Sequence, residues 1–116
     1  MTQVQLRAVG SGTLDGSGSG TVRVGPLGHG VTWLPKVASI RMAGDPPPTA
    51  ATCYVYAGVM ATDAYFCDAT YDVNNDSTDR VSGSELRLGQ YVFAVWSGGT
   101  PGADVTLIVT GDQEVP

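Results

Sequence analysis

The amino-acid sequence predicts an all-β protein, a two-sheet sandwich or jelly roll of about eight or nine short strands. Apolar and polar residues alternate with a period of two along most of the chain, and no long window shows a helical stripe. The 16 glycines, with abundant Val, Thr and Ser, favour strands and tight turns over helices. Turn-forming segments recur every ten residues or so, a spacing typical of sandwiches and barrels.

Composition places the 116 residues in one domain and excludes several functions. Charged residues make up 15% of the chain, below the roughly 25% of ordinary soluble domains, so much of the surface is neutral. The six Lys and Arg are scattered singly in a chain of net charge −5, which argues against nucleic-acid binding. No apolar run is long enough to span a membrane, and the first ten residues lack the pattern of a signal peptide. We therefore expect the protein to be made and kept in the cytosol, or to leave the cell by a route other than a signal peptide, such as release of an assembled particle at lysis.

The N-terminal residues 1–10 are predicted to form a strand or arm. Val4, Leu6 and Ala8 alternate with polar residues and share one face. Residues 11–20 are rich in Gly and Ser, as expected of a flexible connector, and residues 21–116 form the sandwich. An arm on a flexible connector can pair with its own sheet or with a neighbour's. Our hypothesis is that it serves assembly, by adding a strand to a neighbouring subunit.

The predicted strands of the sandwich are separated by glycine- and proline-containing turns. Residues 90–97 differ from the others because apolar side chains occupy both faces of the strand. One sheet of a sandwich is covered on one side only, so we expect a loop, the N-terminal arm or another subunit to cover the second face. The predicted strands are residues 21–25, 31–34, 36–43, 51–58, 63–69, 85–88, 90–97 and 103–110.

No constellation in the sequence indicates catalysis or a bound metal. His29, the one histidine, lies between glycines with no nucleophile or acid near it in sequence, which is typical of a solvated turn residue. The segment 72–79 resembles the start of a calcium loop, but Ser77 and Gly83 occupy the positions of its glycine and bidentate glutamate. Local Asx turns explain it better. We therefore predict no enzyme activity, no cofactor and no metal.

Two cysteines lie symmetrically about Met60. A hairpin that turns at this residue would place Cys53 directly opposite Cys67, where a disulfide is geometrically feasible. Two small buried thiols would suit the same positions in a reducing compartment. The sequence leaves both alternatives open.

Several aromatic residues are candidates for an interface or for stacking on sugars. Tyr54 and Tyr56 share a face with Phe66 if the hairpin turns at Met60, and Trp96 lies on the strand with two apolar faces. Such a cluster either fills a core or forms a compact aromatic patch. If the patch is exposed and flanked by Asn, Asp or Gln, it favours a glycan-binding module that aids host adsorption.

Two stretches, residues 20–35 (GTVRVGPLGHGVTWLP) and 86–111 (LRLGQYVFAVWSGGTPGADVTLIVTG), resemble small β-sandwich virion proteins of bacteriophages that infect actinobacteria. The resemblance implies a non-enzymatic structural protein, either a minor tail or baseplate component or a capsid decoration protein. Such a protein docks on and cements neighbouring subunits, so the implied partners are further copies of the chain and other virion proteins. The implied location is the virion, assembled in the host cytoplasm.

Overall fold

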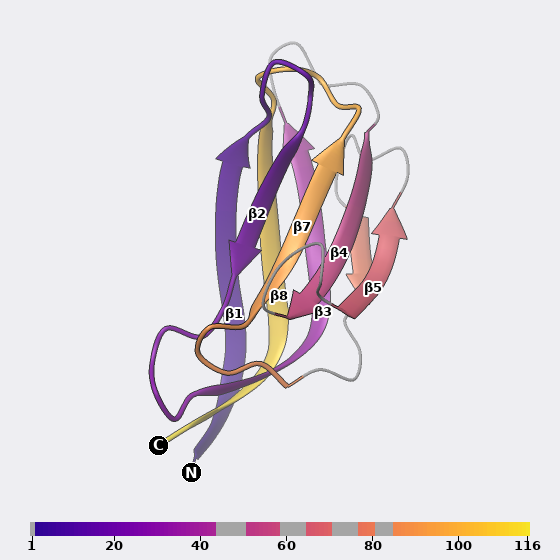
Figure 1. Ribbon diagram of the computed structural model, residues 1–116. Helices are drawn as coiled ribbons and strands as arrows, with labels where there is room; N and C mark the ends of the chain where they lie inside the picture. The colour runs from indigo at the N-terminus through magenta and orange to yellow at the C-terminus, as the bar shows by residue number, and fades with distance from the viewer. Residues whose placement is uncertain (1, 44–50, 59–64, 71–76, 81–84) are drawn as a thin grey trace.

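The computed structural model describes residues 2–43, 51–58, 65–70, 77–80 and 85–116, and only the backbone of residues 65–70 and 77–80. Two four-stranded antiparallel sheets pack face to face, which confirms the predicted all-β sandwich (Figure 1). The described residues contain no helix. The strands are β1 (Thr2–Thr13), β2 (Gly20–Val24), β3 (Thr32–Ala43), β4 (Thr52–Gly58), β5 (Tyr65–Thr70), β6 (Ser77–Arg80), β7 (Tyr91–Ser97) and β8 (Asp104–Val115).

The strand order is that of a jelly roll. One sheet runs β1-β8-β3-β6 and the other β2-β7-β4-β5. The first strand therefore pairs with the last, the second with the seventh, the third with the sixth and the fourth with the fifth. This pattern is a long double strand rolled into two sheets, the arrangement seen in many capsid and lectin domains.

The core lies between the two sheets and is built from alternate residues of their strands. In the first sheet, Ala38 and Ile40 of β3 are fully buried beside the alternate apolar residues of β8. In the second sheet, the inward face of β7 carries Val92, Ala94 and Trp96. Each strand contributes side chains at every second position, as the pleat requires.

The N-terminal strand belongs to the sandwich of its own chain. β1 pairs with β8 along its whole length, from Thr2 opposite Val115 to Thr13 opposite Asp104. Leu6 is buried in the core, Ala8 packs against that core, and Val4 is exposed near the end of the sheet. The N-terminal strand therefore pairs with the sheet of its own chain and not with that of a neighbour, because Leu6 is buried among apolar residues of the same chain.

The segment expected to be a flexible connector is ordered, which corrects that interpretation. β1 continues to Thr13, and Leu14 is buried in the core. The following turn is closed by the Asp15 carboxylate, which accepts hydrogen bonds from the Ser17 amide (2.9 Å), the Ser17 hydroxyl (2.7 Å) and the Ser19 amide (3.1 Å). Glycine and serine serve here to make a tight Asx-type turn.

The same hydrogen bonds lower the pKa of Asp15 below its ordinary value of 3.8, with the Ser17 hydroxyl the main cause. A carboxyl whose folded-state pKa is depressed stabilises the fold above its unfolded pKa and loses that contribution as the pH falls through the folded value.

We therefore expect Asp15→Ala to melt at a lower temperature than the wild type at pH 7. The difference should shrink below pH 3.8 in circular-dichroism melts. Asp104→Ala, at an exposed position on β8, is the matched control. An Asp15→Ala difference that does not change with pH would contradict this role.

Strand β3 is longer than expected. Residues 31–34 and 36–43 were predicted as two strands broken at Pro35, but they form one strand with a register irregularity between Pro35 and Val37. At Pro35 the neighbour is β8 alone, because β6 pairs only with Val37–Ile40. The missing amide of the proline is therefore tolerated at a bulge on a locally unpaired edge.

Other boundaries also differ from prediction. Residues 85–88 make a single bridge, in which Leu86 and Trp33 exchange backbone hydrogen bonds of 2.8 and 3.0 Å, instead of a strand. Residues 77–80, expected in part as a turn, form β6. The remainder of the segment 72–79 that resembles a calcium loop lies outside the described residues.

The register of the β4–β5 hairpin differs from the symmetrical turn at Met60. Cys53 is buried and lies opposite Thr70, and the pairing then shifts between Val55 and Tyr56. Cys67 falls within this shift, three residues along β5 from the position opposite Cys53. The predicted direct opposition of the two cysteines is therefore wrong, because an extra residue in β5 displaces the pairing. The backbone register gives no geometric support to a disulfide.

Candidate binding surface

The outer faces of the two sheets differ in chemistry. The outer face of the β1-β8-β3-β6 sheet is largely polar, with Thr, Ser, Gln and charged side chains at successive cross-strand positions. Its apolar members are few, chiefly Val9 opposite Ile108. Such a face is typical of the solvated side of an antiparallel sheet. The residues concerned include Gln3, Gln5, Arg7, Ser11 and Thr13 of β1, Asp104, Thr106, Thr110, Asp112 and Glu114 of β8, and Ser39 and Arg41 of β3.

The outer face of the β2-β7-β4-β5 sheet is aromatic. We call the cluster of Arg23, Tyr54, Tyr56, Tyr91 and Phe93 the aromatic face. Phe93 lies at its centre, opposite Arg23 of β2 on one side and Tyr56 of β4 on the other. These side chains point away from the core, because their neighbours on β7 and β4 are the inward residues.

Edge-to-face contacts and a stacked cation fix the rings of the aromatic face. Tyr91 and Phe93 are 5.7 Å apart between ring centroids at 60°, and Tyr54 and Tyr56 are 6.4 Å apart at 71°. The guanidinium carbon of Arg23 lies 4.3 Å from the centroid of Tyr91, within the range of a cation–π interaction. Phe93 is only 4% exposed, whereas the three tyrosines are half-buried. The second apolar face of β7, for which the sequence required a cover, is therefore covered among the described residues by neighbouring side chains of the aromatic face.

The candidate aromatic residues from the sequence separate into different environments. Tyr54 and Tyr56 lie on the aromatic face, and the backbone of Phe66 is opposite Tyr56, although its side chain lies outside the description. Trp96 is 1% exposed in the core, so it is removed from the candidate interface. Its indole Nε1 has no hydrogen-bond partner in the described part of the chain. Trp96 lies in the core because it shares the inward face of β7 with Val92 and Ala94.

Beside the aromatic face, a groove of about 640 Å³ opens between β1, the end of β2 and the β2–β3 loop. Its walls are mostly apolar, and its polar members are Arg23 and Gln113. Tyr91 and Arg23 belong to both features, so the groove continues the aromatic face around the edge of the sandwich. The lining residues are Ala8, Val9, Arg23, Val24, Gly25, Leu27, Gly28, Val31, Trp33, Tyr91 and Gln113.

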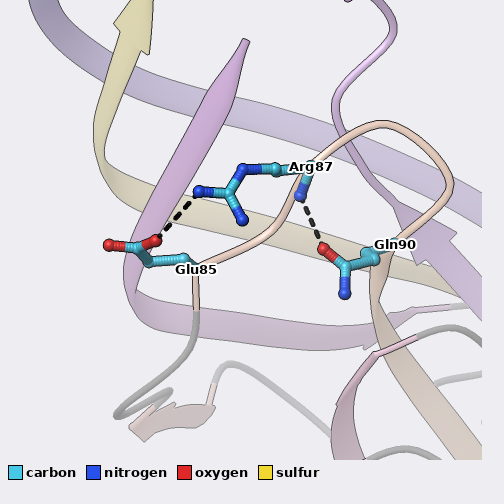
Figure 2. Close-up of polar contacts among 3 residues, drawn as sticks. All are labelled: Glu85, Arg87 and Gln90. Atoms are coloured by element: carbon cyan, nitrogen blue, oxygen red, sulfur yellow. Dashed lines mark hydrogen bonds and ion pairs between the residues drawn. The ribbon is translucent and has the colours of Figure 1, made fainter. Parts of the chain in front are cut away.

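Backbone packing places Tyr91 at the junction of the face and the groove. A Cβ atom at Gly25 would meet the Tyr91 ring, so the glycine lets the end of β2 lie against it. The preceding loop is held by Gln90, whose side-chain oxygen accepts a 2.8 Å hydrogen bond from the Arg87 amide (Figure 2). The Arg87 side chain also lies 3.5 Å from the Glu85 carboxylate in an exposed ion pair.

The loop between β2 and β3 carries apolar residues into solvent. Leu27 is 94% exposed at its tip, and Val9 of the adjoining strand is 51% exposed. His29 is exposed in the same loop and lines a smaller hollow with Arg87 and Leu88. This placement matches the predicted solvated turn histidine.

Sequence reasoning missed Arg23, Tyr91 and Leu27 as site residues. Alternation placed Arg23 on the outer face, but only the pairing of β2 with β7 brings it beside Tyr91, some seventy residues away in the sequence. The pattern of two apolar faces on residues 90–97 was the available signal. In the described residues, no group of three or more His, Cys, Asp or Glu side chains is arranged to hold a metal ion. No helix of the described chain is long and apolar enough to cross a membrane.

The chain was compared with protein-family models and with curated proteins. No family model matches it, and no curated protein matches it.

Proposed function

We propose that this protein is a non-enzymatic structural component of a bacteriophage virion, a minor tail or baseplate protein or a capsid decoration protein. In this role it docks on neighbouring subunits through the aromatic face. The observation that carries the proposal is the contrast between the two sheets of the jelly roll, one polar outside and the other carrying half-buried Tyr54, Tyr56 and Tyr91 beside Arg23. The resemblance of residues 20–35 and 86–111 to phage virion proteins supports the setting.

The residue types of the aromatic face suit docking on protein. Tyrosine and arginine are enriched at the energetic centres of protein interfaces, where large, rigid side chains become desolvated at low entropic cost. The central Phe93 is already buried by its neighbours, which leaves a preorganised patch whose rings are fixed by edge-to-face contacts. Preorganisation lowers the entropic cost of association.

Glycan binding is the second candidate, because half-buried tyrosines also stack on sugars. The geometry favours it less. Arg23 covers one face of the Tyr91 ring, and Tyr54 and Tyr56 stand at 71° to each other instead of forming a flat platform. The other outward side chains of β2, β7 and β4 on this face are Thr21, Val95, Ser97 and Thr52, so the Asn, Asp or Gln flank expected of a sugar site is not among them.

The proposal is tested on purified particles of the phage whose genome encodes the chain. We expect mass spectrometry to find the protein in gradient-purified virions in stoichiometric amount. Tyr54→Ser and Tyr56→Ser should reduce its incorporation by about tenfold or more, because truncation at the centre of an interface costs at least 1.4 kcal/mol or so. Far-ultraviolet circular dichroism should show both variants still folded.

The matched control is Ile108→Ser, at a half-buried position on the polar sheet. Its incorporation should equal that of the wild type. Particles that lack the protein would overturn the virion role. If both tyrosine variants are incorporated normally but no longer bind host-wall glycan, the aromatic face is a glycan-binding site and not a docking surface.

A further inference from the structure

The groove beside the aromatic face has a mostly apolar lining and one arginine. Its volume of about 640 Å³ lies in the range of pockets that hold small ligands or side chains. Apolar walls come from Val24 and Leu27 of the β2–β3 region and from Val31 and Trp33 of the facing segment. Leu27 is 94% exposed, and contact with a partner would bury its apolar side chain, which is favourable in free energy.

Arg23 is the one charged residue among those that line the groove. Its guanidinium is stacked on Tyr91 and is exposed, and no carboxylate of the described residues forms an ion pair with it. Acidic residues outnumber basic ones by 11 to 6 in this chain, so an arginine held in place without an acid is a distinctive feature. A guanidinium oriented by stacking retains its hydrogen-bond donors for a carboxylate.

The groove also adjoins an open edge of the first sheet. Ala8 and Val9 of β1 line it, and β8 is the one strand among the described residues that pairs with β1. β1 contains no proline and a single charge, Arg7, so it lacks the devices that usually block pairing at a long edge. At Gly10 the inner side of β1 is in close contact with Val22 and Val24, and the groove opens where β2 ends at Val24.

We propose that this groove binds an extended segment of a partner protein that carries an acidic residue next to apolar residues. The segment adds as a strand to the open edge of β1, with its carboxylate on Arg23 and its apolar side chains between Leu27 and Val31. Backbone pairing supplies the affinity of such a complex and the side-chain contacts supply its specificity. This inference names the partner chemistry for the docking role proposed above and rests on that role.

The test is fluorescence anisotropy with labelled peptides of about eight residues that alternate valine and threonine around one central glutamate. We expect saturable binding to the full chain, at least about tenfold weaker when lysine replaces the glutamate. Binding should weaken from about 50 mM to about 500 mM salt, because the carboxylate–guanidinium pair is screened. Arg23→Gln and Leu27→Ser should each weaken binding about tenfold. Arg41→Gln, on the outer face of the other sheet, should bind as the wild type does.

Any one of four results in the peptide assay would overturn the inference. These are no binding of the glutamate peptide, equal binding of the glutamate and lysine peptides, an Arg23→Gln protein that binds as tightly as the wild type, or undiminished binding after N-methylation of the peptide amides. If sedimentation shows a dimer that Leu27→Ser dissociates, the occupant is a second copy and the peptide assignment fails. The peptide assay can fail while the protein is still found in particles, so this failure is distinct from failure of the virion role.

Discussion

Deletion of residues 1–10 is expected to abolish cooperative folding, because these residues form the greater part of an integral strand. They supply the pairing from Thr2 opposite Val115 to Gly10 opposite Leu107. They also supply Leu6, which is 2% exposed in the core. Without them, β8 becomes an edge strand and one side of the core opens to water. This expectation replaces the hypothesis that residues 1–10 form an arm that adds a strand to a neighbouring subunit.

Magnitudes support loss of folding over mild destabilisation. Removal of a buried leucine side chain alone costs about 2–5 kcal/mol, and small domains are stable by about 5–15 kcal/mol in total. The deletion adds loss of the β1–β8 hydrogen bonds to the loss of Leu6. Thermal and denaturant unfolding followed by circular dichroism should show no cooperative transition for the truncated chain.

Single substitutions provide the graded controls for this deletion. Leu6→Ala should stay folded and lose about 2–5 kcal/mol of unfolding free energy. Val4→Ala, at a site 39% exposed, should lose less than about 1 kcal/mol. If the truncated chain melts as the full chain does and only self-association weakens, residues 1–10 pair with a neighbouring subunit, as the sequence-based hypothesis of an assembly arm proposed.

Local periodicity was sufficient to predict the fold class and most inward faces. Ala38, Ile40 and Met42 share one face of the predicted strand 36–43 by alternation, and all three are buried. Val22, which alternates with polar residues on the predicted strand 21–25, is buried in the same way. Alternation did not identify the inward face of β7, because both of its faces are apolar. Alternation reports which side of a strand is apolar, and this is the property that decides the packing of a sandwich.

Features that depend on contact between distant segments were beyond such reasoning. Pairing of Arg23 with Tyr91 follows from the β2–β7 register, and the displacement of Cys67 follows from an extra residue in β5. Pro35 was expected to end a strand, but β3 passes it at a bulge where it has one neighbour only. Each outcome depends on how two strands are paired in register. The alternation of apolar and polar residues along one strand carries no information about that pairing.

Glycine-rich segments were the largest source of error, because glycine was interpreted as flexibility. Gly18 has a φ of 77°, and its carbonyl oxygen accepts a 3.0 Å hydrogen bond from the amide of Gly99, in the turn between β7 and β8. A Cβ atom at Gly18 would overlap the backbone of Gly99. Two turns distant in the sequence thus touch backbone to backbone at one end of the sandwich, and this contact requires a residue without a side chain.

Substitution of Gly18 should therefore destabilise the protein strongly. In Gly18→Ala the left-handed conformation costs about 1–2 kcal/mol, and the overlap with Gly99 must separate the two turns. We expect a total loss of about 3 kcal/mol or more, or a fall in melting temperature of about 10 °C or more. Differential scanning calorimetry provides both quantities.

Two neighbouring glycines separate the causes of that loss. Gly98 has a φ of 71° with open space around it, so Gly98→Ala should lose only the conformational cost of about 1–2 kcal/mol. Gly16 has open space and no positive φ, so Gly16→Ala should be neutral or slightly stabilising, through the lower entropy of the unfolded chain. The expected order of stability is Gly16→Ala, then Gly98→Ala, then Gly18→Ala. Equal melting of all three variants would mean that the turn at residues 15–19 is mobile, as predicted for the connector of residues 11–20, because only a mobile segment can admit a side chain at Gly18 without separating it from Gly99.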